Sequence, residues 1–336
     1  MPVPAYHVDH EVLATHAKNK VNVPSGDAAK RRTQVNHLRS RLEAHIAAHP
    51  DYDLVKLRAS GSTAKHTAIR RRRGEGSDAD VAAYVRASSV GGVSVEVSGL
   101  LEWLKDRCVE VYGATKDADD FVISDHAVGI TLRGSGLKID VAPVLYEGEA
   151  DDRGHLVTRQ GDKVLTSVTL HLAFIHTRRN AAGPNYRELI RLLKAWIREA
   201  KRNDDQLRCK SFLLELIVAH LWDHGWNGEA LAVNNYPRAF EQVLSYIAHT
   251  DLLAPVVFTD FYPATEVTPS SDPIQFWDPV NPTNNVTRTY TDADRQRLVK
   301  TATTALEDVM WAAHAPTKGD ANQAWRNLLG PAFEGA

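Results

Sequence analysis

Two aspartates one residue apart, Asp78 and Asp80, are the residues in this sequence best suited to chemistry. They open the run 78–86, whose apolar residues predict a strand. Side chains two positions apart on a strand point to the same face, so the two carboxylates would lie close together and repel one another unless a cation separates them. The pair therefore predicts a site for Mg²⁺, which prefers hard oxygen ligands and often shares them with phosphates.

Asp140 is the third candidate ligand, because it lies in a second β-rich run at 137–145. If the two runs pair side by side, the three carboxylates converge and could hold two Mg²⁺ ions, with Mn²⁺ as the alternative metal. Asp140 would then help to deprotonate an attacking hydroxyl group. It would act either as the general base or as a ligand of the metal that lowers the hydroxyl pKa.

A Gly-Ser pair, Gly61 and Ser62, ends the strand predicted over 54–62. Such a turn lets backbone N–H groups and a hydroxyl approach phosphate oxygens closely. The chain has no G-x-x-x-x-G-K-[ST] pattern, so this is not a Walker A loop. The order Gly-Ser, Asp-x-Asp on a strand and Asp on a later strand predicts a metal-dependent site that binds phosphates.

Three other groups of charged residues receive structural interpretations. Residues 70–73 are four arginines just before the Asp pair, which could capture triphosphate or nucleic acid electrostatically but which we interpret as a solvated loop. Asp117, Asp119 and Asp120 are interpreted as solvated side chains in another loop. A second Asp-x-Asp begins at Asp292 but precedes a helical pattern, where residues two apart do not share a face. Asp292 is therefore interpreted as a helix cap.

The elements that position these residues change in kind near residue 160. Before it the pattern alternates strands with helices, and after it helices dominate apart from a Pro- and Asn-rich loop at 263–290. We expect an α/β unit at 1–160 and a helical unit at 161–336. The strands are predicted at 54–62, 78–86, 129–133 and 137–145, and the helices at 25–49, 97–112, 186–201, 211–223, 236–250 and 291–314.

Composition excludes several classes of protein. Hydrophobic residues make up 43% and charged residues 24% of the 336 residues, which predicts a sizeable core rather than disorder. The net charge of -2 gives no general affinity for nucleic acid. Cys108 and Cys209 are the only cysteines, too few for a disulfide framework or a zinc cluster. The sequence shows no apolar run long enough to span a membrane, so we expect a cytoplasmic protein with no membrane partner.

The ordered motifs carry a resemblance to known enzymes. Residues 61–67 (GSTAKHT), 77–80 (SDAD) and Asp140 resemble the DNA polymerase β-type nucleotidyltransferase superfamily. Residues 189–196 (LIRLLKAW), 210–216 (KSFLLEL) and 276–286 (FWDPVNPTNNV) resemble elements of the oligoadenylate synthetases. The chain is therefore similar to the bacterial cGAS/DncV-like nucleotidyltransferases of CBASS anti-phage systems, which make cyclic or short linear oligonucleotide second messengers.

The resemblance implies an α+β, bilobal fold, with a mixed-sheet nucleotidyltransferase core, a helical C-terminal lobe and the active site in the cleft. Nucleoside triphosphates would be the substrates. Gly61 and Ser62 would hold the donor triphosphate, and Asp78 and Asp80 would bind both metal ions. Asp140 would bind one of the two ions.

Three residues of the C-terminal half are assigned by the resemblance alone. Lys194 and Ser211 would grip phosphates of the substrate. Phe212 stands where relatives often place a tyrosine that stacks on a base. A phenylalanine keeps the ring face but lacks the hydroxyl, which leaves the choice of base open.

The resemblance also implies partners. A downstream effector would bind the product rather than the enzyme. The C-terminal residues Gly335 and Ala336 are compatible with conjugation by an accessory CBASS enzyme. A nucleic-acid activator is left open.

Two other functions use the same residues. An RNA or tRNA 3′-end nucleotidyltransferase would share the chemistry but should show an extended basic surface and salt-sensitive RNA binding. An inactive nucleotide-binding regulator is disfavoured because all three carboxylates are present.

Overall fold

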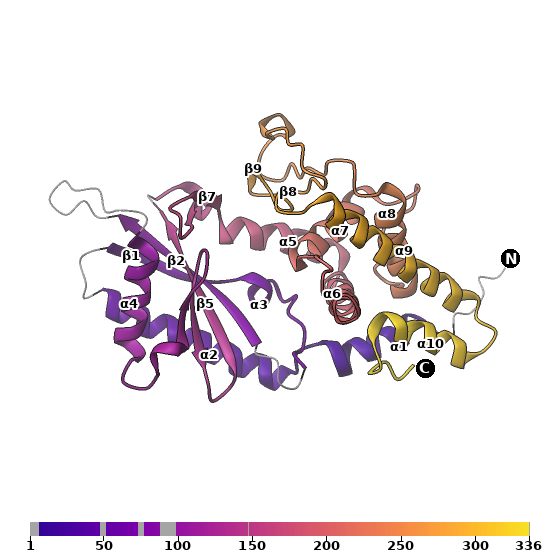
Figure 1. The fold of residues 1–336 in the computed structure, drawn as a ribbon, viewed down its shortest axis with the longest axis horizontal. Helices are drawn as coiled ribbons and strands as arrows, with labels where there is room; N and C mark the ends of the chain where they lie inside the picture. The colour runs from indigo at the N-terminus through magenta and orange to yellow at the C-terminus, as the bar shows by residue number, and fades with distance from the viewer. Residues whose placement is uncertain (1–6, 48–51, 73–76, 88–98, 147, 336) are drawn as a thin grey trace. The chain divides into compact units, whose positions relative to one another are not determined.

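The computed structural model describes residues 7–47, 52–72, 77–87, 99–146 and 148–335 (Figure 1). The chain forms two compact units, one of Val23–Ala173 and one of Met1–Asn22 with Phe174–Ala336. This division differs from the expected 1–160 and 161–336 in two respects. The first 22 residues belong to the C-terminal unit, and the boundary falls inside the helix α5 (Val168–Ala182).

A mixed sheet forms the centre of the N-terminal unit. Its strand order is β1-β2-β5-β4-β3, with β2 parallel to β5 and the other pairs of this path antiparallel. Two further strands, β6 and β7, continue from the end of β5. The predicted hairpin, formed by β4 and β5, is confirmed. The strands are β1 (Tyr52–Ser60), β2 (Ser77–Ala87), β3 (Phe121–Ile123), β4 (Val128–Leu132), β5 (Leu137–Leu145), β6 (Gly154–Val157) and β7 (Lys163–Thr166).

Two helices cover one face of this sheet, α2 (Ser25–Ile46) and α4 (Leu100–Tyr112). The large apolar residues of α2, Val35, Leu38, Leu42 and Ile46, recur at spacings of three and four and are buried, as the sequence predicts. They pack with alternate residues of β2, namely Ala79, Val81 and Ala83. Because side chains alternate along a strand, Asp78 and Asp80 point to the other face of the sheet.

The C-terminal unit is helical, as predicted. Its helix α7 is apolar nearly all round, and eight of its residues are buried, which confirms a core helix. The helices are α1 (His10–His16), the π-helix η1 (Ala17–Val21), α5, α6 (Asn185–Asn203), α7 (Ser211–His224), α8 (Tyr236–Thr250), α9 (Asp292–His314) and α10 (Lys318–Leu329).

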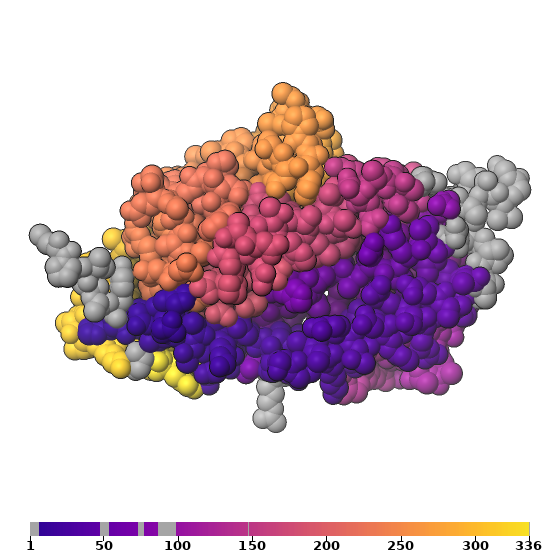
Figure 2. Space-filling view, turned by 180° about the vertical axis from the view of Figure 1, so that it is seen from behind, coloured from indigo at the N-terminus to yellow at the C-terminus, as the bar shows by residue number. Residues whose placement is uncertain are grey.

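The predicted loop at 263–290 contains a short hairpin of β8 (Trp277–Asp278) and β9 (Asn281–Asn285). Asn285 is buried, and its side chain accepts from the backbone N–H of Phe276 at 3.0 Å and donates to the Ile274 carbonyl at 2.8 Å. The Asn-rich motif is therefore structural. Residues 263–269, mostly exposed, stand out from the surface of the C-terminal unit (Figure 2).

Two of the structural interpretations need correction. The cap of α9 is Thr291 rather than Asp292, because Thr291 and Asp294 form a reciprocal capping box. Asp120 is buried rather than solvated and accepts from Arg133 Nε at 2.7 Å. No helix within the described part of the chain is long and apolar enough to cross a membrane.

Candidate active site

The strand register brings the three predicted carboxylates together. β2 and β5 pair in parallel with Asp80 opposite Asp140 and Asp78 opposite Lys138. Across the same row, Ser60 of β1 lies opposite Asp80, and Gly129 of β4 lies opposite Asp140. The two aspartates in register thus lie on the face of the sheet that α2 and α4 leave free.

Of the three aspartates, Asp80 has the most crowded surroundings. Partial burial raises its pKa, and the nearby carboxylates of Asp140 and Asp78 raise it further. On its other side is Gly61, which has a φ of +62°, where a Cβ would come within 1.8 Å of Asp80 Oδ2. Only glycine lets the Gly-Ser turn approach this carboxylate so closely.

The Gly-Ser pair begins a short helix, α3 (Gly61–Lys65), directly after β1. The Ser62 carbonyl accepts from the backbone N–H groups of Thr67 at 2.9 Å and Ala68 at 3.1 Å. His66 ends the helix in a left-handed conformation, with φ of 58°. These bonds fold the residues after Ser62 back on it and fix the turn beside the aspartates.

Two cationic side chains lie against the outer carboxylates. Arg71 forms an ion pair with Asp78, and Lys138 Nζ lies 3.0 Å from Asp140 Oδ1. Gly129 makes room for the second pair, because a Cβ there would come within 2.5 Å of Lys138 Cε and 2.9 Å of Asp140 Oδ1. Part of the arginine run is thus placed at the site rather than in a solvated loop, although Arg73 lies outside the described residues.

The residues present fit a divalent cation. Three carboxylates are crowded on one sheet face, which raises the pKa of Asp80. A cation would relieve this crowding of negative charge. Within the described residues, no group of three or more His, Cys, Asp or Glu side chains is already spaced to hold a metal ion. Asp78 and Asp140 pair with Arg71 and Lys138 instead.

In the C-terminal unit, Lys194 of α6 is buried, with 5% of its side chain exposed. Its Nζ donates to Glu215 Oε1 of α7 at 2.7 Å, and the Glu215 side chain is 3% exposed. A buried ammonium requires such a partner. The pair therefore ties α6 to α7 as well as placing a positive charge near the start of α7.

Ser211 and Phe212 are the first two residues of α7. Ser211 is exposed and Phe212 is half-buried, and no side chain caps this helix end. Lys210, just before it, donates its backbone N–H to the Tyr290 hydroxyl at 2.7 Å. An uncapped helix N-terminus with an exposed hydroxyl suits an anion such as a phosphate group.

Sequence reasoning missed three charged residues of these sites: Arg71, Lys138 and Glu215. Lys138 could have been found, since it stands two residues before Asp140 on the same strand and therefore on the same face. The arginine run could be seen to precede the Asp pair, but which arginine reaches Asp78 could not be predicted, and neither could Glu215, because these contacts depend on how the chain folds back.

Comparison with known proteins identifies the family. A family model described as 2'-5'-oligoadenylate synthetase 1, domain 2, C-terminus matches residues 144–328. The cyclic AMP-AMP-AMP synthase of Escherichia coli MS 115-1 is 38% identical over 330 residues, covering 98% of this chain and 99% of that protein. The chain belongs to the bacterial CBASS nucleotidyltransferases. It is accordingly an oligonucleotide cyclase. Enzymes of this family are generally metal-dependent.

Solved structures agree with this membership. E. coli MS 115-1 CdnC with ATP has a TM-score of 0.86 to this CBASS nucleotidyltransferase, with 98% of this chain and 100% of that chain covered. The same E. coli protein in a complex with HORMA-deltaN has a TM-score of 0.85. Vibrio cholerae DncV, at 13% identity and a TM-score of 0.71, shares the fold. The expected α+β fold, with a mixed-sheet core and a helical C-terminal region, is confirmed.

Proposed function

We propose that this enzyme joins adenylate units from ATP into a cyclic oligoadenylate. The observation that supports this most is the register of Asp80 and Asp140 on β2 and β5, in a chain 38% identical over its full length to a cyclic AMP-AMP-AMP synthase. The carboxylates would supply the chemistry shared by the superfamily. The cyclic AMP-AMP-AMP synthase suggests that adenine is the nucleobase used.

The proposed reaction is an in-line displacement at the α-phosphate. A ribose hydroxyl of the acceptor attacks the α-phosphorus of the donor, a new O–P bond forms, and the bond to pyrophosphate breaks. Two Mg²⁺ ions held by Asp78, Asp80 and Asp140, or Mn²⁺ in their place, would lower the pKa of the hydroxyl and neutralise the triphosphate. Asp140, in register with Asp80, would accept the hydroxyl proton.

Positive side chains would stabilise the charge that develops on the phosphates. Lys138 lies beside Asp140, and the Gly61-Ser62 turn, which approaches Asp80 at Gly61, would supply backbone and hydroxyl donors. Lys194 would donate to a phosphate while Glu215 holds it, since an ammonium group has three protons to donate. Ser211 would bind phosphate at the uncapped start of α7.

Phe212 is the proposed stacking residue for a base. Its ring is half-buried at the start of α7, which leaves part of it available for contact. Stacking on an aromatic ring tolerates any base, at roughly 1–3 kcal/mol per base. Selection of adenine would therefore come from polar groups other than Phe212.

A HORMA-domain protein is the proposed accessory partner, because the E. coli relative was solved in a complex with one. Conjugation of the C-terminus stays a prediction, as does an effector that binds the product. Near this end Phe333 is buried, and Glu334, whose side chain is mostly exposed, pairs with Lys20 at 2.5 Å.

The test incubates the full chain with Mg²⁺ and labelled nucleoside triphosphates, omitting one triphosphate at a time. Products are treated with phosphatase and identified by mass spectrometry, with and without a HORMA-domain protein such as the one bound by the E. coli relative, and with and without tRNA. A cyclic product formed from ATP alone supports the proposal. A product that needs a second nucleoside triphosphate contradicts the proposal that ATP is the only substrate. Label transferred to tRNA indicates a 3′-end transferase instead.

A further inference from the structure

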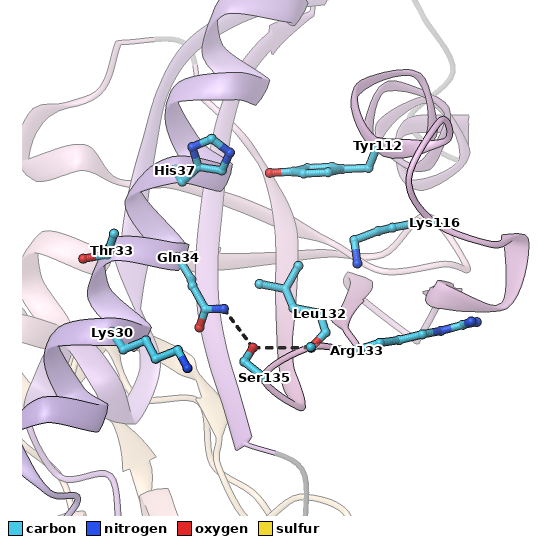
Figure 3. A pocket seen from close by; sticks show the side chains of 10 residues that line it. Lys30, Thr33, Gln34, His37, Tyr112, Lys116, Leu132, Arg133 and Ser135 are labelled. Carbon is cyan, nitrogen blue, oxygen red and sulfur yellow. Dashed lines mark hydrogen bonds between the residues drawn. The ribbon is translucent and has the colours of Figure 1, made fainter.

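A hollow of about 430 Å³ lies in the N-terminal unit, lined by residues other than the three carboxylates (Figure 3). One wall is a face of α2 that carries Lys30, Gln34 and His37 at helical spacing. The opposite walls are the end of α4, with Tyr112, and the turn that joins β4 to β5. Its volume is within the range of small-molecule sites.

The charge of this hollow is positive. Lys30 and Lys116 line it from opposite sides, and none of its ten lining residues is acidic. Arg133 contributes less, because its guanidinium turns away and is bound by Asp120 at 2.7 Å and by Asp117. The exposed Lys30 and the half-buried Lys116 are therefore the cations that a ligand would meet.

The hollow also offers specific polar and apolar contacts. Gln34 donates through Nε2 to Ser135 Oγ at 2.8 Å, while its Oε1 is buried and accepts no hydrogen bond. A buried acceptor without a donor costs free energy, which a ligand N–H group would recover. Leu132 and the buried Tyr112 supply apolar surface beside these groups (Figure 3).

We propose that this hollow binds a small phosphorylated or carboxylated molecule with a flat apolar body and an N–H donor. The anionic group would lie between Lys30 and Lys116, the flat body against Leu132 and Tyr112, and the N–H group at Gln34. The concave, partly apolar lining favours a small molecule over the backbone of a nucleic acid, which contacts protein mostly through phosphates and sugars.

The position of the hollow connects it to the catalytic strands. Its floor includes the β4–β5 turn, whose Gly136 carbonyl accepts from the backbone N–H of Ser77 at 3.1 Å. Ser77 directly precedes Asp78, and β5 runs from the same turn to Asp140. A ligand that shifts this turn would therefore move both strands, so its binding is expected to change the rate of turnover.

The first test is calorimetric titration of the full chain with phenyl phosphate in EDTA, so that binding does not depend on a metal at the carboxylates. The variant is Lys30→Glu, and the matched control is Arg32→Glu, an exposed arginine on the same helix that does not line the hollow. We expect one site in the intact protein, with affinity about tenfold weaker in Lys30→Glu and unchanged in Arg32→Glu.

Equal binding by all three proteins, or equal loss in both variants, would overturn the proposal. Tight binding of a DNA duplex that Lys30→Glu weakens, with no binding of phenyl phosphate, would assign the surface to nucleic acid instead. Turnover measured with and without phenyl phosphate tests the link to the strands. Binding of phenyl phosphate without a change in the turnover rate would contradict that link. The calorimetric result does not depend on whether the protein has the proposed activity.

Discussion

Asp80 is held between the carboxylates of Asp78 and Asp140 in a partly buried position on β2, and both effects raise its pKa. A carboxyl group whose pKa is raised on folding stabilises the fold only while protonated, and that stability is lost as pH rises through the folded-state value. Ionisation of Asp80 therefore lowers the stability of the metal-free protein at the position where catalysis needs a carboxylate.

Asp80→Asn should separate the effect of this carboxylate on stability from its effect on catalysis. In EDTA at pH 7 we expect its Tm to be a few degrees above that of the intact protein, because the charge is removed and the shape is kept. The difference should shrink as pH falls toward the ordinary aspartate pKa of about 3.9. Thermal denaturation measures this, with the exposed Asp119→Asn as control. A variant no more stable than the intact protein at pH 7 would contradict it.

Gly61→Ala tests the close approach of the Gly-Ser turn. The added Cβ would overlap Asp80 Oδ2 and must adopt a φ of +62°, so we expect loss of about 1 kcal/mol or more of stability and of most activity. Gly26→Ala is the control, because a Cβ there meets nothing within 4 Å. Equal turnover by both variants would show that the turn does not need glycine.

The Lys194–Glu215 pair allows a structural role to be distinguished from phosphate binding. Lys194→Met alone removes the cation that lies against the buried Glu215 carboxylate, which costs about 3–5 kcal/mol. Adding Glu215→Leu should restore most of the stability, because both charges are then gone. Activity should stay low in the double variant if Lys194 contacts phosphate. Recovery of turnover together with stability would assign the lysine a structural role only.

At the scale of elements, Arg178 ties α5 to the rest of the C-terminal unit. Its buried guanidinium binds Asp223 of α7 at 2.5 Å and Asp260 at 2.9 Å, and it lies 3.8 Å over the Phe174 ring. All five donors of an arginine can be used in such a network, which a lysine could not reproduce.

Arg178→Met should lower the free energy of unfolding by about 3–5 kcal/mol, since two partly buried aspartates lose their cation. Denaturant titration measures the loss. The neighbouring Arg179→Met, whose described contact is a single hydrogen bond to Asn180, is the control and should change little. A cost below 1 kcal/mol for Arg178→Met would contradict this role.

The same helix shows where sequence reasoning ends. Strands and helices with a clear period, such as β2, α2 and α6, were predictable because each pattern is local. Helix α5 was not, because polar residues such as Arg178 interrupt its apolar face and are buried through partners far along the chain. Likewise, the strand carboxylates were predictable from spacing, whereas Arg71 and Glu215 enter their sites through tertiary contacts alone.

At the scale of the whole molecule, residues from near the beginning and near the end of the chain pack together within the C-terminal unit. His16 of α1 packs against Phe333, with ring centroids 5.1 Å apart. Burial and the charge of Lys20 lower the pKa of His16 to about 4, and burial also lowers that of His220 in α7 to about 4. Both histidines are therefore neutral in the folded protein near pH 5.

Stability should consequently fall as pH decreases from about 6.5 toward 4, because the unfolded chain binds protons that the folded chain excludes. For His16 the expected cost at pH 5 is about 2 kcal/mol. His16→Gln should flatten the pH profile of Tm over this window, whereas His7→Gln, at an exposed position, should not. Parallel profiles for His16→Gln and the intact protein would contradict the assignment.

The central claim is that the carboxylates on β2 and β5 catalyse the joining of nucleotides. The most direct measurement is the yield of phosphatase-resistant product from labelled ATP by the intact protein, by Asp80→Asn and by Asp292→Asn, which alters the Asp-x-Asp at the start of α9. We predict equal yields from the intact protein and Asp292→Asn, and none from Asp80→Asn. Full product from Asp80→Asn, or its loss in Asp292→Asn, would contradict the account.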